Sequence, residues 1–138
     1  MKVFLVPNYR KNEAVESGLS LELWLGRQGY EVAWAADQRS GITAAPDIEG
    51  SDLVISLGGD GTLLRAARIV GYQEIPILGL SYGHVGFLAA ASPEERDVLG
   101  VVADALAGEM HVSRRATLSV EVYAHESMGG KAALETLP

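Results

Sequence analysis

The amino-acid sequence predicts an α/β fold in which helices cover both faces of a doubly wound, parallel sheet. Three short apolar runs, at residues 3–6, 53–57 and 76–80, have the length and composition of strands buried on both faces. Segments with an apolar residue at every third or fourth position separate these runs and predict helices. Strands that alternate with helices form βαβ units, whose strands are parallel and whose crossovers are right-handed.

The first βαβ unit is predicted to span residues 3–35. Its first strand ends at a turn-forming Pro-Asn pair, residues 7–8. Asn12 is placed to cap the following helix, which stops at Gly29. A second strand follows at residues 31–35 and completes the unit.

Apolar side chains of this unit are expected to form part of the core. The helix positions expected to face it are Val15, Leu19 and Leu23, with Leu21, Trp24 and Leu25 beside them. Trp34 in the second strand is likewise expected to pack in the core rather than to bind a ligand.

The next strand leads into the most informative stretch of the chain. Residues 37–51 are polar and contain glycine and proline, so they predict a loop with room for a short helix. The apolar run that follows passes into Gly-Gly-Asp-Gly-Thr at residues 58–62, and a helical pattern then continues to Gly71. These features predict a strand, a tight turn and the start of a helix.

The glycines of this turn predict a ligand site. Without Cβ atoms, Gly58, Gly59 and Gly61 allow a ligand close to the backbone, and they are free to adopt positive φ angles. Backbone N–H groups and the positive end of a helix dipole then favour an anion, most often phosphate. Asp60 is costly in such a place unless it handles a metal ion or a substrate proton. The alternative is a purely structural turn in which Asp60 caps the helix.

A second glycine-rich stretch follows the strand at residues 76–80. Glycines at positions 79, 83 and 86 suit a further backbone surface close to a ligand at the carboxyl end of the sheet. A set of structural turns is the alternative reading of this spacing.

The remaining residues are expected to be structural. Ser92, Pro93 and Glu95 mark the start of a helix that ends at Gly108. Period-two alternation at residues 117–123 predicts a half-buried strand, and a turn at residues 127–130 leads to a returning strand at 132–137. Two strands are marginally stable alone, so residues 110–138 are expected to begin a second, mostly β domain after an α/β domain at 1–109.

The turn at residues 58–62 resembles the signature of a kinase superfamily. Its members include NAD kinases, diacylglycerol and sphingosine kinases and, more distantly, phosphofructokinases. The pattern Gly-x-x-x-Gly-x-x-Gly-Phe-Leu at residues 79–88 is similar to the second motif of NAD kinases, whereas lipid kinases carry a different motif there. The chain departs from the family at Ser81, where Asn is usual, so one amide donor is lost.

This resemblance implies a Rossmann-like fold and the transfer of a phosphoryl group to the adenosine ribose 2′-hydroxyl of NAD, which gives NADP. The donor is ATP or another donor such as polyphosphate, and Mg²⁺ or another divalent metal offsets the phosphate charge. Asp60 is implied to be the general base. The resemblance implies nucleotide-binding roles for Gly58, Gly59, Gly61, Thr62, Arg65, Ser81, Gly83 and Phe87.

Several alternatives stay open at this point. The alternative for Arg65 is a solvated helix residue, and the alternative for Phe87 is a core residue. The alternatives for the whole chain are a lipid kinase domain and a non-catalytic nucleotide-binding module. The resemblance places the family's ribose-holding Asn-Glu or Asn-Asp motif beyond Pro138, so a fragment that is inactive alone is expected. Family members are typically homo-oligomers.

The amino-acid composition limits which binding partners and which cell compartment are expected. The chain has no cysteine, which excludes disulfides and thiolate zinc sites, and three scattered histidines, His84, His111 and His125, predict no metal site. A net charge of −7 argues against nucleic-acid binding. No apolar run is long enough for a signal peptide or a membrane span, so a cytoplasmic location is expected.

Overall fold

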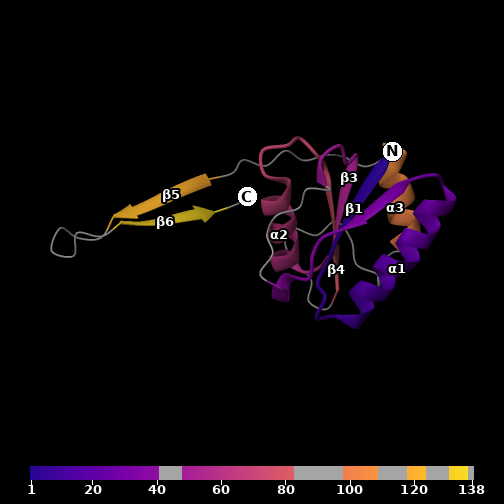
Figure 1. Cartoon of the computed structure of the whole chain (residues 1–138), viewed down its shortest axis with the longest axis horizontal. Coiled ribbons are helices and arrows are strands. Elements are labelled where there is room, and N and C mark those ends of the chain that lie inside the picture. The colour runs from indigo at the N-terminus through magenta and orange to yellow at the C-terminus, as the bar shows by residue number, and fades with distance from the viewer. Residues whose placement is uncertain (41–47, 83–97, 109–117, 124–130, 137–138) are drawn as a thin grey trace.

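The fold is a four-stranded parallel sheet with helices on both faces (Figure 1). The computed structural model describes residues 1–40, 48–82, 98–108, 118–123 and 131–136. The sheet has the order β2-β1-β3-β4 and consists of β1 (Lys2–Pro7), β2 (Glu31–Trp34), β3 (Leu53–Gly58) and β4 (Ile77–Ser81). The helices are α1 (Asn12–Arg27), α2 (Asp60–Val70) and α3 (Val98–Leu106), with a short 3-10 helix η1 (Gln38–Ser40). The predicted doubly wound α/β sheet is therefore confirmed.

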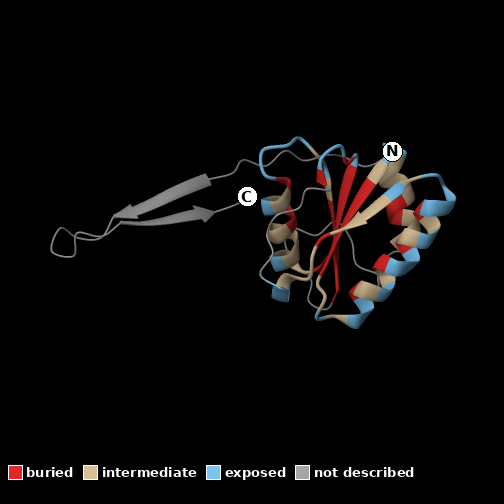
Figure 2. Ribbon diagram, in the orientation of Figure 1, coloured by how far each residue is buried: buried red, intermediate tan, exposed pale blue. Residues whose placement is uncertain are grey.

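The central strands β1 and β3 are buried on both faces because helices pack against each side (Figure 2). Alternate residues of β1 show this: Val3 and Leu5 join the core under α1 and α3, whereas Phe4 and Val6 join the core under α2. The same alternation in β3 sends Ile55 to the first core. This arrangement explains why both strands read as continuous apolar runs.

The helix α1 buries a different face from the one predicted. Its buried residues are Ala14, Gly18, Leu21 and Leu25, whereas Leu19 and Leu23 are 54% and 62% exposed and Val15 is half-buried. Gly18 explains the difference, because a Cβ there would lie 2.6 Å from Cη2 of Trp34 and 3.3 Å from Cδ1 of Leu57. Small residues let the helix approach the sheet closely, and Leu19 and Leu23 are turned outward.

The start of α1 also differs from the prediction. Lys11 is the N-cap and Asn12 is the first helical residue, without a capping hydrogen bond from a side chain. The other predictions for this unit hold, since Gly29 follows the helix at a φ of +87°. Trp24 and Trp34 pack against the core as predicted, and Nε1 of Trp34 also donates to Glu22 at 2.8 Å.

The later elements agree with the predictions where they are described. η1 is the short helix of the predicted loop, and α3 occupies the described part of the helix expected after Ser92, whose start lies outside the described residues. The strands β5 (Leu118–Tyr123) and β6 (Lys131–Thr136) pair antiparallel, as expected. The turn predicted at residues 127–130 lies outside the described residues.

In the described part of the chain, no helix combines the length and apolar character required to cross a membrane.

We expect Gly18→Val to destabilise the fold by about 1–3 kcal/mol, because the added methyl groups have to displace the Trp34 ring. Gly26→Val is the matched control in the same helix, since a Cβ there meets no atom within 4 Å. Urea unfolding of both variants measures the difference. Equal free energies of unfolding for the two variants would contradict the close packing of α1.

Candidate active site

The candidate site lies where the winding of the sheet reverses. From β1 the chain moves outward to β2 and then returns past β1 to form β3, so the reversal falls between β1 and β3. In open parallel sheets, ligands bind at the carboxyl ends of the strands beside this reversal. The turn at residues 58–62 follows β3, and Asn8 follows β1, which places both at this point.

Gly58 is enclosed by its neighbours. It is buried at the end of β3, and a Cβ there would lie 2.3 Å from Oγ1 of Thr62 and 3.1 Å from Cβ of Asn8. No side chain fits in that space. Gly58 therefore serves the close packing of the turn against the first turn of α2, and Thr62 points back over it.

Gly59 and Gly61, unlike Gly58, are not enclosed by neighbouring side chains of the described residues. A Cβ on either residue would meet no atom of the described residues within 4 Å, so this part of the chain leaves the backbone open to a ligand there. The expected positive φ angles are not found, because Gly59 has a φ of −127° and the described positive angles belong to Gly29, Gly50, Gly71 and Gly108. Glycine is used in this turn for space and not for left-handed backbone.

Asp60 lies between these two open positions, as the first residue of α2. The N-cap is Gly59, so the alternative in which Asp60 occupies the cap position is wrong. The first backbone bond of the helix runs from the Leu63 N–H to the Gly59 carbonyl at 3.0 Å. The N–H groups before Leu63 lie at the positive end of the helix dipole, where an anion is stabilised. Asp60 is half-buried, with its carboxylate at this end of the helix.

The second glycine-rich stretch begins beside this turn. Ser81 is the strand neighbour of Gly58, and the Tyr82 N–H donates to the Gly58 carbonyl at 2.5 Å. Ser81 is buried, with 4% of its surface exposed. The predicted site residues Gly83 and Phe87 lie outside the described residues.

Arg65 reaches across to the loop after β2. Its Nη2 donates to the Ala36 carbonyl at 2.5 Å, whereas its Nη1 is buried without a hydrogen-bond partner in the described structure. Hydrogen bonds from Arg39 lower the pKa of Asp37, in the loop after β2, to about 2, and the charge of Arg65 adds slightly to this effect. The guanidinium is thus held in the structure, and the alternative of a freely solvated helix residue is wrong.

A loop that the sequence did not single out holds the site together. The Asn8 N–H donates to the Leu57 carbonyl at 2.8 Å, and Asn8 Oδ1 accepts from Gln38 Nε2 at 2.6 Å. Lys11 Nζ donates to the Tyr82 carbonyl at 2.6 Å. Residues 8–11 therefore connect the ends of β2, β3 and β4. The only sequence signal for them is a Pro-Asn pair at the end of a parallel strand.

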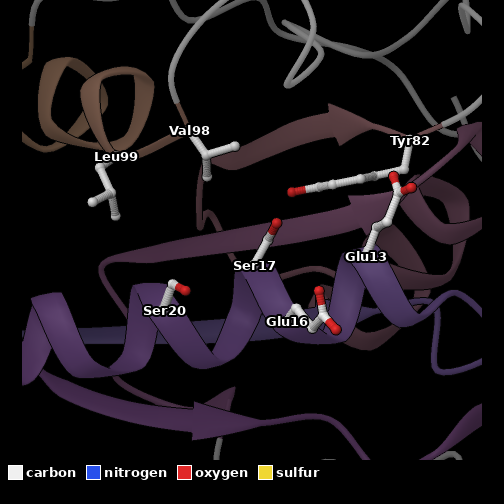
Figure 3. A pocket seen from close by; sticks show the side chains of 7 residues that line it. All are labelled: Glu13, Glu16, Ser17, Ser20, Tyr82, Val98 and Leu99. Carbon is white, nitrogen blue, oxygen red and sulfur yellow. The ribbon is translucent and has the colours of Figure 1, made fainter.

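A cavity of about 470 Å³ lies near this region, between α1 and α3 (Figure 3). It is lined by Glu13, Glu16, Ser17, Ser20, Tyr82, Val98 and Leu99. Burial raises the pKa of Tyr82; Ser17 opposes this effect and Glu13 adds to it. Two glutamates repel a phosphate, and no residue of the turn at 58–62 lines the cavity, so we do not assign it to the candidate site.

The site offers one carboxylate to a metal ion. Among the described residues, no group of three or more His, Asp or Glu side chains is placed to hold a metal on its own. All three histidines lie outside the described residues. Mg²⁺ is usually bound by one or two carboxylates together with substrate phosphates. Asp60 fits that requirement, but only with a phosphorylated substrate present.

Comparisons with known proteins point to one family. A family model described as "ATP-NAD kinase N-terminal domain" matches residues 39–110. An NAD kinase of Dehalococcoides mccartyi is 35% identical over 109 residues, which are 79% of this chain and 34% of that protein. An NAD kinase of Methanothermobacter thermautotrophicus is 32% identical over 126 residues, which are 87% of this chain and 44% of that protein.

A solved structure has the same fold. The crystal structure of an NAD kinase from Archaeoglobus fulgidus in complex with ATP aligns with a TM-score of 0.63 and 26% sequence identity. The alignment covers 88% of this chain and 42% of that one. This chain therefore spans less than half the length of these proteins.

We expect Gly58→Ala to cost about 1–3 kcal/mol of stability, because its methyl group has to displace the Thr62 side chain or the Asn8 loop. Gly61→Ala is the matched control in the same turn, where open space accepts the methyl group. Thermal unfolding of the two variants tests this contrast. A Gly58→Ala protein as stable as the control would show that the turn is not crowded.

Proposed function

The chain belongs to the NAD kinase family, and from this premise we propose that it takes part in making NADP. The reaction is the transfer of a phosphoryl group from ATP, or from another donor such as polyphosphate, to the adenosine ribose 2′-hydroxyl of NAD. The family match and the Archaeoglobus fulgidus NAD kinase with its ATP support this proposal. The chain spans 34% of the length of the Dehalococcoides mccartyi NAD kinase.

The observation that carries the proposal is the open backbone on both sides of Asp60. Gly59 and Gly61 leave space for a substrate to approach this carboxylate, and the enclosed Gly58 fixes the turn from behind. A reactive carboxylate held between two accessible backbone segments suits a reaction in which positioning supplies most of the rate enhancement. Phosphoryl transfer, with its loose transition state, is such a reaction.

Asp60 is proposed as the general base. It accepts the proton of the ribose hydroxyl as that oxygen bonds to the phosphorus of the donor. A carboxylate suffices because the hydroxyl becomes acidic only as the bond to phosphorus forms. Arg65 lies about one helical turn past the glycine-rich turn on α2 and is proposed to contact NAD, as the family resemblance implies.

Phosphate binding is proposed to depend on local groups. The net charge of −7 repels nucleotides at long range, so the attraction has to come from the first turn of α2 and from a divalent metal. Mg²⁺ bound between Asp60 and the phosphates would supply charge neutralisation. Ser81, the strand neighbour of Gly58, is proposed to line the same site through its hydroxyl.

Two other functions remain to be separated from this one by experiment. A lipid kinase of the same superfamily would phosphorylate diacylglycerol and leave NAD unchanged. A non-catalytic module would bind ATP or NAD without turnover. Parallel assays with Mg²⁺-ATP and either NAD or diacylglycerol, in which the ADP released with each acceptor is measured, distinguish all three.

In the protein as its gene encodes it, we expect Asp60→Asn to lower kcat by about 10² or more while NAD binding is largely retained, because a base acts on the transition state. Glu31→Gln is the matched control, since Glu31 is exposed at the amino end of β2, away from the site. NADP formation measures kcat, and calorimetry measures NAD affinity. Near wild-type turnover by Asp60→Asn would remove Asp60 from the mechanism.

Residues 1–138 on their own are expected to bind ATP but to form no NADP, because the family resemblance places the ribose-holding motif after Pro138. A coupled assay of NADP formation on the purified chain checks this. Robust turnover would mean that the acceptor site lies entirely within these residues.

A further inference from the structure

Lys11 lies at a position where lysine is unfavourable. It is the N-cap of α1, where Ser, Thr, Asp and Asn are preferred because their side chains bond to the first helical N–H groups. Lys11 makes no such bond, and a positive charge is disfavoured at this end of the helix dipole. Local conflicts of this kind are expected at functional or strained sites. The side chain of Lys11 bonds instead to the end of β4.

The backbone and the side chain of Lys11 are both held. Its N–H donates to the Asn8 carbonyl at 3.0 Å, and its carbonyl accepts from Ala14 and Val15 at 3.1 and 3.2 Å. Its Nζ donates to the Tyr82 carbonyl at 2.6 Å. An ammonium donor makes this bond roughly twice as strong as a bond between neutral groups. Because Lys11 is half-buried and Tyr82 is 4% exposed, little water competes with it.

Tyr82 passes this restraint to the turn through its backbone. Its N–H donates to the Gly58 carbonyl at 2.5 Å, so its two polar backbone groups bond to the turn and to Lys11. Its side chain points into the cavity between α1 and α3 (Figure 3). A peptide group is planar, so the bond that holds the Gly58 carbonyl also sets the direction of the Gly59 N–H, on the opposite side of the same group. Lys11 therefore acts on the turn through two successive hydrogen bonds.

We propose that Lys11 is a positioning residue for nucleotide binding at this turn. It holds Tyr82, Tyr82 holds the Gly58 carbonyl, and the Gly59 N–H is thereby aimed at a phosphate of the nucleotide. An N–H that is aimed in advance binds a phosphate more tightly, because it does not have to be ordered when the ligand arrives. This inference rests on the proposed function, since the ligand is the same nucleotide.

The test separates the ammonium group from the rest of the side chain. The chain has no cysteine of its own, so Lys11→Cys provides a unique thiol. Alkylation of the unfolded variant with 2-bromoethylamine, followed by refolding, restores an ammonium group at the same number of bonds from the backbone. Alkylation with iodoacetamide gives a neutral amide of equal length, which is the matched control. Calorimetry measures the dissociation constant of Mg²⁺-ATP for both products and for the wild-type chain.

We expect the aminoethylated product to bind Mg²⁺-ATP as the wild-type chain does. The neutral product should bind it about tenfold more weakly, which is typical of losing one charge-assisted hydrogen bond. Arg27→Met is the control for net charge, because Arg27 is an exposed cation at the opposite end of α1. This variant should bind Mg²⁺-ATP as the wild-type chain does.

Amide hydrogen exchange gives a second readout that does not depend on the nucleotide. The Tyr82 N–H should exchange about tenfold faster in the neutral product than in the aminoethylated one, since its bond to Gly58 is less firmly held. The Asp52 N–H is the internal control, because it donates to the Lys2 carbonyl at 2.8 Å at the amino ends of the strands. Its exchange should be equal in both products.

Two outcomes overturn the role of Lys11 alone. The first is equal affinity or equal Tyr82 exchange in the two alkylated products, beside a wild-type chain that binds Mg²⁺-ATP. The second is a neutral product that fails to refold when the aminoethylated one refolds, with the same failure in Lys11→Met, because Lys11 would then be purely structural. A wild-type chain that binds no Mg²⁺-ATP would contradict the nucleotide site itself, and the inference with it.

Discussion

The candidate site depends on a difference in crowding within one turn. At Gly58 the end of β3 is pressed against Thr62 and the Asn8 loop, so the backbone path is fixed from the inner side. At Gly59 and Gly61 the outer side is empty. Glycine thus permits close packing at one position of this turn and leaves open space at two others. Asp60 lies between the two open positions, an arrangement that suits the catalysis by positioning that we propose.

The frame around this turn is held by contacts between segments far apart in the chain. Lys11 connects the start of α1 to the end of β4, and Asn8 connects the end of β1 to Gln38 after β2. These bonds join the carboxyl ends of the strands without occupying the open side at Gly59. In the proposed mechanism the first turn of α2 has to attract the anionic substrate, because the net negative charge of the chain repels it.

The sequence predicted the parallel sheet, its helices and the turn after β3, because buried strands and the Gly-Gly-Asp-Gly motif are strong local signals. The buried face of α1 was predicted wrongly, because the prediction followed the leucines and not the small residues Ala14 and Gly18, of which Gly18 permits close packing on Trp34. The prediction also missed the link from Asn8 to Gln38, which are 30 residues apart and related only through the fold. Local patterns carry no information on such contacts.

We propose that the nucleotide binds at the turn after β3. Amide chemical shifts of the ¹⁵N-labelled chain, followed during titration with Mg²⁺-ATP, test this proposal. We expect saturable shifts at Gly59, Gly61 and Thr62, with smaller shifts at Arg65. Shifts confined to the cavity residues Glu13, Ser17 and Leu99, with none in the turn, would contradict it.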